Sequence, residues 1–591
     1  MNLTYLRYPA MVLAIVVSLC SGSLLVAAQP NVIIVMADDQ GYGDLSCYGN
    51  PILKTPNLDR LRQQSVSFSD FHVAPMCTPT RGMLMTGVDA FKNGATGVAA
   101  GMTALRTDLP IAPQMFMSNG YRTALFGKWH LGDGYPFRPQ DRGFEEVLSF
   151  NGSMIPVVAN RMNDSYFNPT LLKNGKWEKC EGYITDILFE RAMAWIEERA
   201  KEQKPFFLYL PTPTPHFPNQ VADKYAKPYR GKSHKDSKAP PEFYGMIANL
   251  DENMGRLDSF LRKIDLHDNT ILIYLSDNGT QSDAAYKLFN AGMRGKKISS
   301  FEGGHRVPLF VRWPAGQLLH GEVIKELATV QDILPTLIDL CELKGVHAKF
   351  DGISLAKPLR DAKETIPLRT IVNQYVVVWR DCTGKPWNNT CVMRGPWRLT
   401  SPKELYNIHS DPQQRTNLFN RHPNMVKQLT EDYKTWYATA RRHHQRIQWL
   451  EAGGDAPNPM EFTSIDWMGT CTDTWQHARK QHHSRGYYNI RINETGTYTV
   501  SMRHWPAESG NTLERDIAKA RLRISPPRGV KFDENNKETP VFDETLFLEV
   551  RQAGVFKVKL SAGVYEFAPD FLTKDDRFKK SALRLIVKRD E

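Results

Sequence analysis

Cysteine is scarce in this chain of 591 residues, which contains only eight. That number is too small for a disulfide scaffold, and the length is ample for a large hydrophobic core. Cys382 and Cys391 lie close enough in sequence to pair across a hairpin. Seven cysteines follow the N-terminal segment: Cys47, Cys77, Cys180, Cys341, Cys382, Cys391 and Cys471.

Long apolar runs are also nearly absent, and the one exception lies at the N-terminus. Arg7 precedes the apolar stretch 11–26, which ends in the small residues Val26-Ala27-Ala28. This pattern predicts a signal peptide over residues 1–28, and its apolar stretch is short for a membrane span. We therefore expect a secreted or periplasmic protein that begins near Gln29 and has no membrane span after cleavage. An uncleaved N-terminal anchor is the alternative.

The third absence is that of a nucleic-acid-binding motif, although the chain is basic. Its 75 Lys and Arg outnumber 64 Asp and Glu, which gives a formal charge of +11 and a pI near 9.0. Such a balance suits polyanionic partners in general. The basic residues are nevertheless spread along the chain, so we expect a mildly basic surface and no nucleic-acid partner.

Alternating strands and helices dominate the first 360 residues. Four short apolar runs predict buried strands, and they lie at 32–37, 123–126, 206–210 and 271–275. Between and after them, helical periodicity appears at 186–201, 243–264 and 330–341. This order is typical of an α/β fold with a mostly parallel central sheet flanked by helices, which we assign to residues 29–360.

Two further regions follow. Residues 361–450 predict a small antiparallel subdomain, with strands at 370–372, 375–378 and 404–408 before a terminal helix. Residues 451–591 contain short alternating segments between Gly, Pro and Asn turns, which predicts an accessory β-sandwich-like domain. Its tryptophans could stack on sugar rings or pack in the core. They are Trp467, Trp475 and Trp505.

Polar residues follow all four predicted strands of the α/β region. Open α/β sheets bind ligands at the carboxyl ends of their strands, so we expect these residues to converge. They are Asp38-Asp39, then Lys128 and His130, then His216, then Asp277-Asn278.

Oxygen donors in this set point to a hard cation. Asp38, Asp39, Asp277 and the amide oxygen of Asn278 suit Ca²⁺, with Mg²⁺ less favoured. Thiolate or multi-histidine sets for zinc are not part of this pattern. The alternative for Asp38-Asp39 alone is a helix N-cap pair, but the second strand-end pair favours the metal.

Basic residues accompany the predicted metal site and suit a small oxyanion. Arginine binds two oxygen atoms at once, lysine supplies a point charge, and histidine can hold or donate a proton near neutral pH. Cys77 precedes Pro79, a suitable first helical residue, and a helix N-terminus favours a neighbouring anion. The basic residues are Arg81, Lys128, His130, His216 and Lys297.

These motifs resemble those of the type I, arylsulfatase-like sulfatases of the alkaline phosphatase superfamily. The resemblance covers about residues 30–420. The segments that carry it, in family order, are Asp38 to Asp44, Thr55 to Asp59, Cys77 to Arg81, Gly127 to Gly132, Ser276 to Gly279, Gly295 to Lys297, Glu302 to Gly304, Glu404 to Tyr406 and Thr416 to Leu418.

The resemblance implies that Cys77 is converted to formylglycine (3-oxoalanine) by a formylglycine-generating maturation enzyme. The hydrate of that residue would be the nucleophile, with one hydroxyl on Ca²⁺. The implied metal ligands are Asp38, Asp39, Cys77, Asp277 and Asn278.

The remaining roles also come from the resemblance. Asp277 could accept the proton of the attacking hydroxyl, and His130 would deprotonate the second hydroxyl. Arg81 would hold the hydrate. Lys128, His216 and Lys297 would bind the substrate, the last two at the leaving oxygen. Lys296 adjoins Lys297, and the spacing to Glu302 selects Lys297.

Two other functions stay open. One is a phosphonate monoester or phosphodiester hydrolase of the same superfamily; its two-metal members carry Asp-His where this chain has Asp277-Asn278. The other is a non-catalytic binder of sulfated glycans. The sequence favours a sulfated carbohydrate or an aryl sulfate without choosing between them, and it leaves the oligomeric state open. The basic run 224–238 suggests attraction to a polyanionic glycan, or simply a solvated loop.

Overall fold

The computed structural model describes residues 29–380, 382–444, 446–480, 483–528, 541–549 and 551–590. The predicted signal peptide, residues 1–28, lies outside the described residues. Among the helices of the described part, none is long and apolar enough to cross a membrane.

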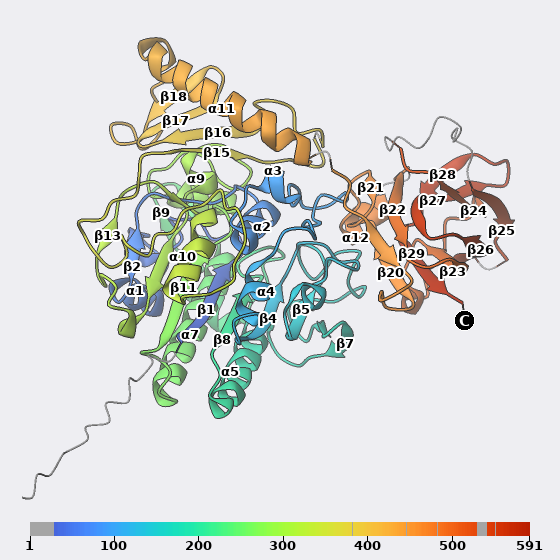
Figure 1. The fold of residues 1–591 in the computed structure, drawn as a ribbon, viewed down its shortest axis with the longest axis horizontal. Helices are drawn as coiled ribbons and strands as arrows, with labels where there is room; N and C mark the ends of the chain where they lie inside the picture. Colours follow the sequence, from blue (N-terminus) through green and yellow to red (C-terminus); the bar gives the residue numbers. More distant parts are fainter. Residues whose placement is uncertain are drawn as a thin grey trace, which may run out of the picture.

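A ten-stranded sheet forms the centre of the molecule (Figure 1). Its order is β13-β2-β12-β11-β1-β8-β4-β5-β6-β7. The four predicted strands are its adjacent members β11, β1, β8 and β4, which run parallel. The bounds are β13 (Val323–Ile324), β2 (Val66–Phe68), β12 (Leu309–Arg312), β11 (Thr270–Ser276), β1 (Asn31–Ala37), β8 (Phe206–Pro211), β4 (Arg122–Lys128), β5 (Glu146–Phe150), β6 (Thr170–Lys173) and β7 (Lys176–Lys179).

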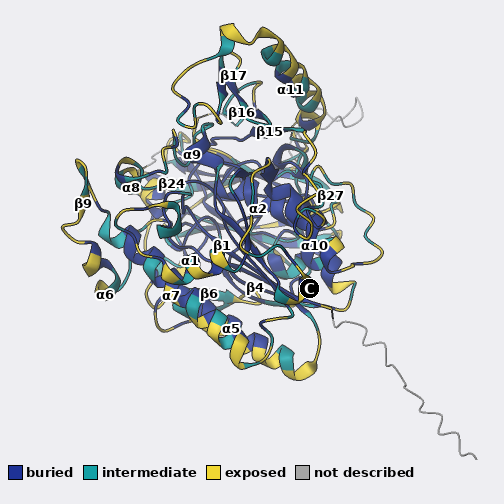
Figure 2. Ribbon diagram, turned by 90° about the vertical axis from the view of Figure 1, so that its left-hand side faces the viewer, coloured by how far each residue is buried: buried dark blue, intermediate teal, exposed yellow. Residues whose placement is uncertain are grey.

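Helices cover both faces of this sheet, so its central strands are buried on both sides (Figure 2). Along β1, alternate side chains enter different cores: Ile34 joins the core with α4 and α10, whereas Val35 joins the core with α5 and α7. Such strands show no polar alternation, which is why the sequence reads as continuous apolar runs. The helices are α1 (Pro56–Gln63), α2 (Cys77–Thr86), α3 (Ala90–Asn93), α4 (Ala112–Met117), α5 (Ile184–Glu202), α6 (Asp223–Ala226), α7 (Pro241–Lys263), α8 (Asp283–Leu288), α9 (Glu302–His305) and α10 (Ile333–Leu340).

A four-stranded antiparallel sheet with one long helix follows. Its order is β15-β16-β17-β18, and α11 packs on it. The bounds are β15 (Thr370–Gln374), β16 (Thr390–Arg394), β17 (Trp397–Ser401), β18 (Glu404–Asn407) and α11 (Pro423–His444).

Two predictions for this region are wrong. Residues 375–378 form no strand; they leave the sheet and pack with Cys77 and the 98–100 segment, where Val376 N donates to Thr96 O. Burial in that loop contact, rather than strand pairing, explains their apolar character. Cys391 is a buried free thiol in β16, so it does not pair with Cys382.

The last region is a two-sheet β-sandwich around one core. Trp467 is fully buried there and Trp475 nearly so, while the half-buried Trp505 stacks on Trp475; the packing interpretation of these residues is confirmed. One sheet has the order β19-β22-β27-β24-β25, and the other β20-β29-β23-β26. The main strands are β22 (Gly486–Ile492), β23 (Gly496–Arg503), β24 (Ile517–Ser525), β25 (Phe542–Phe547), β26 (Ala553–Leu560), β27 (Gly563–Thr573) and β29 (Arg584–Arg589). The shorter ones are β19 (Leu450–Ala452), β20 (Met460–Thr463), β21 (Met468–Gly469) and β28 (Phe578–Ser581), and α12 (Trp475–Lys480) precedes β22.

The sandwich packs directly on the α/β region. Phe137, Met154 and Val157 belong to its core, and Gly101 N donates to Ile465 O at 3.0 Å. The predicted fold class is thus confirmed, while the domain boundaries at 360 and 450 stay predictions.

Candidate active site

The polar residues after β1, β4, β8 and β11 converge at one buried site. Lys128 Nζ donates to Asp38 Oδ2 at 2.7 Å, and Asp39 N donates to Asp277 Oδ1 at 3.0 Å. His216 Nε2 lies 3.6 Å from Asp39 Oδ2. The structure therefore brings together residues that are up to 239 positions apart, as the strand-end pattern predicts.

Two oxygen atoms of this site lack hydrogen bonds. Asp38 Oδ1 and Asn278 Oδ1 are buried without a partner. Among the described residues, donor atoms of Asp38, Cys77 and Asp277 lie within 4.8 Å of one another. Burial, followed by the nearby Asp38, raises the pKa of Asp277 to about 6. Unpaired oxygens and crowded negative charge both fit a hard divalent cation, so the residues present suit the predicted metal.

Basic side chains balance the carboxylates. Arg81 Nη2, from α2, donates to Asp277 Oδ2 at 2.7 Å, and Lys297 Nζ lies 2.6 Å from Asp39 Oδ1. With Lys128 on Asp38, three cations face three carboxylates. A divalent ion would leave two positive charges in excess, which favours an anionic ligand.

Lys297 and its neighbour Lys296 point to different places. Lys297 reaches Asp39, as the spacing to Glu302 predicts, whereas Lys296 Nζ lies 3.3 Å from Asp283 Oδ1.

Cys77 is the first residue of α2, directly beside His130. The prediction that Pro79 begins this helix is wrong, because Met76 already has extended backbone and the helix starts at Cys77. Cys77 Sγ lies 3.4 Å from His130 Nδ1, and His130 Nε2 lies 3.0 Å from Val98 O. A carbonyl only accepts, so Nε2 carries the proton and Nδ1 faces Cys77 as an acceptor.

Burial keeps this pair neutral. It raises the pKa of the Cys77 thiol, although Lys128 and Lys297 oppose the shift. Burial, together with Lys128, holds the pKa of His130 well below its ordinary value. His130 is thus a neutral base at neutral pH, and an unmodified Cys77 is a poor nucleophile because little thiolate forms.

His216 reaches the same site from the proline-rich loop after β8. Its Nδ1 donates to Phe217 O at 2.7 Å, which leaves Nε2 toward Asp39. Burial lowers the pKa of His216 well below its ordinary value, although Asp39 opposes the shift. The ring stacks on Phe217, which is 48% exposed. An exposed aromatic ring beside the buried histidine is a feature that the sequence prediction missed; its only signal was adjacency to His216.

The prediction also missed the backbone that supports His130. The 96–102 segment supplies the Val98 carbonyl, and this segment contacts both residues 375–378 and the β-sandwich through Gly101. No side-chain pattern could have revealed a carbonyl acceptor, because any residue type supplies one.

A family model described as Sulfatase matches residues 30–343, more than half of the chain. The chain belongs to the sulfatase family. The fold and the convergent site identify it as a type I sulfatase of the alkaline phosphatase superfamily.

Individual relatives agree with this assignment. The chain is 29% identical over 358 residues to N-acetylgalactosamine-6-sulfatase of Rattus norvegicus; the match covers 55% of this chain and 65% of that protein. The chain thus spans slightly less than two thirds of the length of that relative. It is 28% identical over 496 residues to N-acetylgalactosamine-6-O-sulfatase of Bacteroides thetaiotaomicron, covering 68% of this chain and 92% of that one. Among solved structures, Ps i-CgsB in complex with k-i-k-neocarrahexaose is 26% identical to this chain, with a TM-score of 0.62. The match covers 71% of this chain and 95% of that chain.

Proposed function

We propose that this sulfatase hydrolyses sulfate esters through a formylglycine made from Cys77, with one bound Ca²⁺. The observation that carries the proposal is the pairing of Cys77 with the neutral His130 inside a buried cluster of oxygen donors and cations. A buried thiol with a raised pKa is poorly suited to attack by itself, which favours its conversion to an oxygen nucleophile.

The two groups that this site would take supply distinct chemistry. A hard divalent cation held by Asp38, Asp39, Asp277 and Asn278 would polarise a sulfate oxygen and favour an ionised hydroxyl nearby. A hydrated aldehyde at residue 77 would offer one hydroxyl for attack on sulfur and a second for the later release of sulfate.

The side chains of the chain itself bind the ester and move protons. Lys128 and Lys297 place positive charge where sulfate oxygens would lie, and Arg81 holds Asp277 in position. Lys297 Nζ and His216 Nε2 both face Asp39, and the Lys297 ammonium is placed to stabilise or protonate the leaving alcohol oxygen. His130 Nδ1 faces residue 77 and is placed to take the proton of the second hydroxyl.

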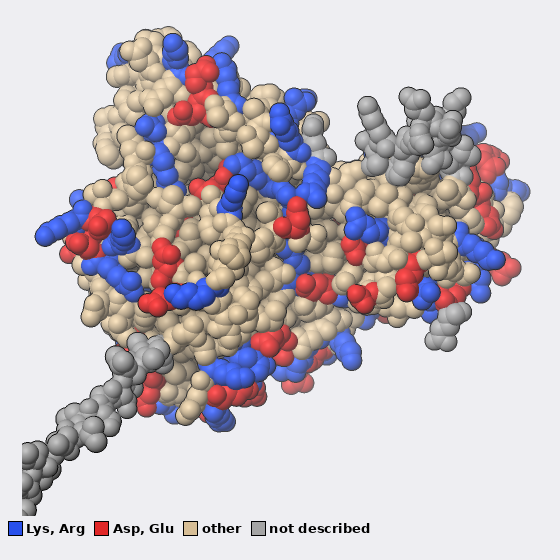
Figure 3. All heavy atoms as spheres, in the orientation of Figure 1, with Lys and Arg blue, Asp and Glu red and all other residues tan. Residues whose placement is uncertain are grey.

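The proposed substrate is a sulfated carbohydrate, with aryl sulfates as smaller alternatives. Two relatives are named for a sulfated amino sugar, and one solved relative holds an oligosaccharide. The exposed Phe217 offers a flat apolar surface beside the site, which suits a sugar ring. On the face shown in Figure 3, basic and acidic side chains intermingle. That face therefore shows no continuous basic surface along which a sulfated polymer would bind.

We also propose a secreted or periplasmic location and a formylglycine-generating enzyme as maturation partner. The location rests on the predicted signal peptide, and the partner rests on the expected conversion of Cys77.

The test is sulfate release by the purified protein from a panel of sulfated sugars and aryl sulfates. We expect turnover by the wild type and none by Cys77→Ala. Cys341→Ala is the matched control: Cys341 is also buried and free, but it lies at the end of α10. Retained turnover in Cys77→Ala would refute the mechanism.

The panel also includes phosphonate monoesters and phosphodiesters. Faster turnover of these compounds than of every sulfate ester would favour the phosphonate or phosphodiester hydrolase. Tight binding of sulfated glycan without any turnover of mature protein would instead indicate a non-catalytic binder.

A further inference from the structure

A second buried cluster of ionisable groups lies outside the site around Cys77. We call it the histidine cluster: His72 at the end of β3 (Phe71–His72), with Glu302 and His305 of α9. All three residues have an exposed fraction of 0%, and their potential ligand atoms lie within 4.8 Å of one another. No step of the proposed reaction uses them.

Hydrogen bonds determine which ring nitrogens of the cluster carry protons. His72 Nε2 lies 2.8 Å from Asp70 Oδ1, and the same carboxylate forms an ion pair with Arg398, whose Nη2 donates to it at 2.7 Å. His305 Nε2 lies 3.2 Å from Ser300 O. An ionised carboxylate and a carbonyl only accept hydrogen bonds, so both Nε2 atoms are protonated.

The two Nδ1 atoms of the cluster then face each other. They lie 2.8 Å apart, and in neutral rings each presents a lone pair. Two lone pairs at this distance repel unless a positive species lies between them or beside them.

A carboxylate oxygen completes the cluster. Glu302 Oε1 accepts from Arg398 Nε at 2.8 Å, whereas Glu302 Oε2 is buried without a hydrogen-bond partner. Histidine ligands of metals usually donate their remote N–H to a carboxylate or a carbonyl, as His72 and His305 do here.

We propose that the histidine cluster binds one divalent transition-metal ion, for which Zn²⁺ is the best fit. The ligands would be His72 Nδ1, His305 Nδ1 and Glu302 Oε2. Two imidazole nitrogens and one carboxylate oxygen suit Zn²⁺, whereas the oxygen donors around Asp38 suit Ca²⁺. The chain would thus hold two different metals.

The surrounding charges limit the affinity of this site. Asp70 and Glu302 are already paired with Arg398, and Arg306 lies 3.5 Å from Glu302 Oε2. Two carboxylates and two guanidinium groups cancel, so the charge of the ion is not neutralised. We therefore expect weaker binding than at a thiolate-bound structural zinc, with affinity that falls as the pH is lowered.

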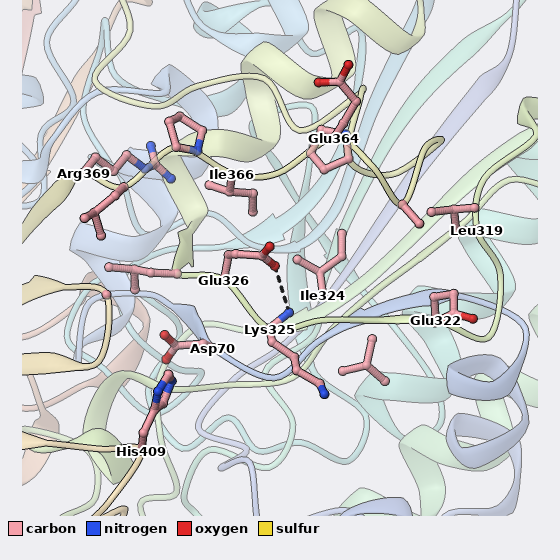
Figure 4. Close-up of a pocket in the computed structure, with 17 residues that line it drawn as sticks. Asp70, Leu319, Glu322, Ile324, Lys325, Glu326, Glu364, Ile366, Arg369 and His409 are labelled. Atoms are coloured by element: carbon pink, nitrogen blue, oxygen red, sulfur yellow. Dashed lines mark hydrogen bonds between the residues drawn. The ribbon is translucent and has the colours of Figure 1, made fainter.

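A cavity lies next to the residue that holds His72. Asp70, which holds His72, forms part of the wall of a cavity of about 590 Å³ (Figure 4). Figure 4 shows Asp70 beside His409 on this wall, and the lining also includes Leu368, which is 66% exposed. The cavity thus reaches the residue that holds His72.

The proposed ion would stabilise the position of a residue in the active site. Helix α9 carries Glu302 and His305, and Gly304 O in the same helix accepts from Gly279 N at 2.9 Å. The approach is so close that a Cβ at Gly279 would lie 1.9 Å from Gly303 O. Because Gly279 follows Asn278, holding α9 also positions the amide of Asn278.

The first test is metal analysis of the full-length protein. Wild type and His305→Gln are dialysed against a buffer that contains Zn²⁺ and an excess of Ca²⁺. Bound zinc is then measured by inductively coupled plasma mass spectrometry. We expect about one more zinc ion per chain in the wild type. The matched control is His504→Gln, because His504 is equally buried and donates Nε2 to a carbonyl, that of Ala478. Equal zinc in wild type and His305→Gln would overturn the proposal.

A second measurement uses the wild-type protein alone and does not require catalytic turnover. Its result is therefore independent of the proposed sulfatase activity. Co²⁺ is added to wild-type protein in excess Ca²⁺, and visible absorption typical of nitrogen-ligated Co²⁺ is expected to persist. Absence of such a band would overturn the proposal. So would a strongly deshielded imidazole proton in the ¹H NMR spectrum of zinc-treated protein, because a proton would then fill the gap between the rings.

Discussion

Two buried clusters of one protein use similar residues in different ways. Around Cys77 and at the histidine cluster, carboxylates are paired with an arginine, Arg81 in the first case and Arg398 in the second. The atoms that could bind a cation differ: carboxylate and amide oxygens around Asp38, but two facing ring nitrogens and one carboxylate oxygen at the histidine cluster. The donor atoms that face one another, rather than the number of charged residues, thus indicate which cation each cluster suits.

Removing the hard cation should have the largest effect. A calcium-selective chelator is expected to abolish turnover, because the oxygens of Asp38 and Asn278 would lose their partner and the excess positive charge would disappear. Sulfate release is measured before and after Ca²⁺ is restored. Full activity in the presence of the chelator would contradict a role for these oxygens in binding a metal. Recovery of activity with Zn²⁺ but not with Ca²⁺ would contradict the proposal that the two clusters bind different metals.

Replacing His130 should have the next largest effect. His130→Gln is expected to lower kcat by about 100- to 10,000-fold, because the base that faces residue 77 is lost. The midpoint of thermal unfolding should change little. His504→Gln, at a buried histidine far from the reaction, should leave kcat unchanged. Similar losses in both variants would show that burial, not position, explains the effect.

Breaking the ion pairs of the histidine cluster should affect stability more than chemistry. Arg398→Met leaves Asp70 and Glu302 buried without their main partner, and we expect a loss of about 3–5 kcal/mol in the free energy of unfolding. Arg521→Met is the control, since its pair with Asp543 is exposed and should contribute about 0–1 kcal/mol. Urea unfolding measures both, and equal losses would contradict the contrast between buried and exposed pairs.

The smallest effect is expected at a carboxylate pair without basic partners. Where the α/β region meets the sandwich, Asp133 N lies 3.4 Å from Asp466 Oδ1. Burial raises the pKa of Asp466 to about 6, and burial with Asp466 raises the pKa of Asp133 well above its ordinary value. Both carboxyl groups therefore hold protons more tightly in the folded state than in the unfolded state.

The sign of the pH dependence follows from these raised pKa values. The stabilising contribution is fully present below the ordinary carboxyl pKa and is lost as the pH rises through about 6. Asp133→Asn should therefore raise the free energy of unfolding at pH 8 relative to wild type by about 1 kcal/mol, with a smaller gain at pH 5. Urea unfolding at the two pH values measures this difference in the free energy of unfolding. A larger gain in stability at pH 5 than at pH 8 would contradict the predicted pH dependence.

The sequence predicted the central sheet and the residues of the first cluster for a physical reason. Strands buried on both faces read as apolar runs, such as 32–37, and parallel strands end at one edge, which brings Asp38 and Asp277 together. It did not predict the histidine cluster. His72 and His305 are 233 positions apart, and neither follows one of the four predicted strands. Glu302 enters the prediction only as part of the segment Glu302 to Gly304 and as the spacing marker for Lys297.

Other features could not be predicted because backbone and tertiary contacts decide them. Residues 375–378 have the composition of a strand, but burial against the 98–100 segment keeps them out of the sheet. The longest strand of the sandwich, β27, contains Pro569 and is largely buried, so it lacks the polar alternation that revealed its neighbours.

The central claim, that residue 77 reacts as formylglycine at this site, has one direct test. The tryptic peptide spanning residues 63–81 is isolated from the active protein of the natural host, and its mass and fragmentation are measured. The account predicts that the CH₂–SH side chain at position 77 has become an aldehyde, in proportion to the sulfate-releasing activity. An unmodified thiol throughout a fully active preparation would contradict it.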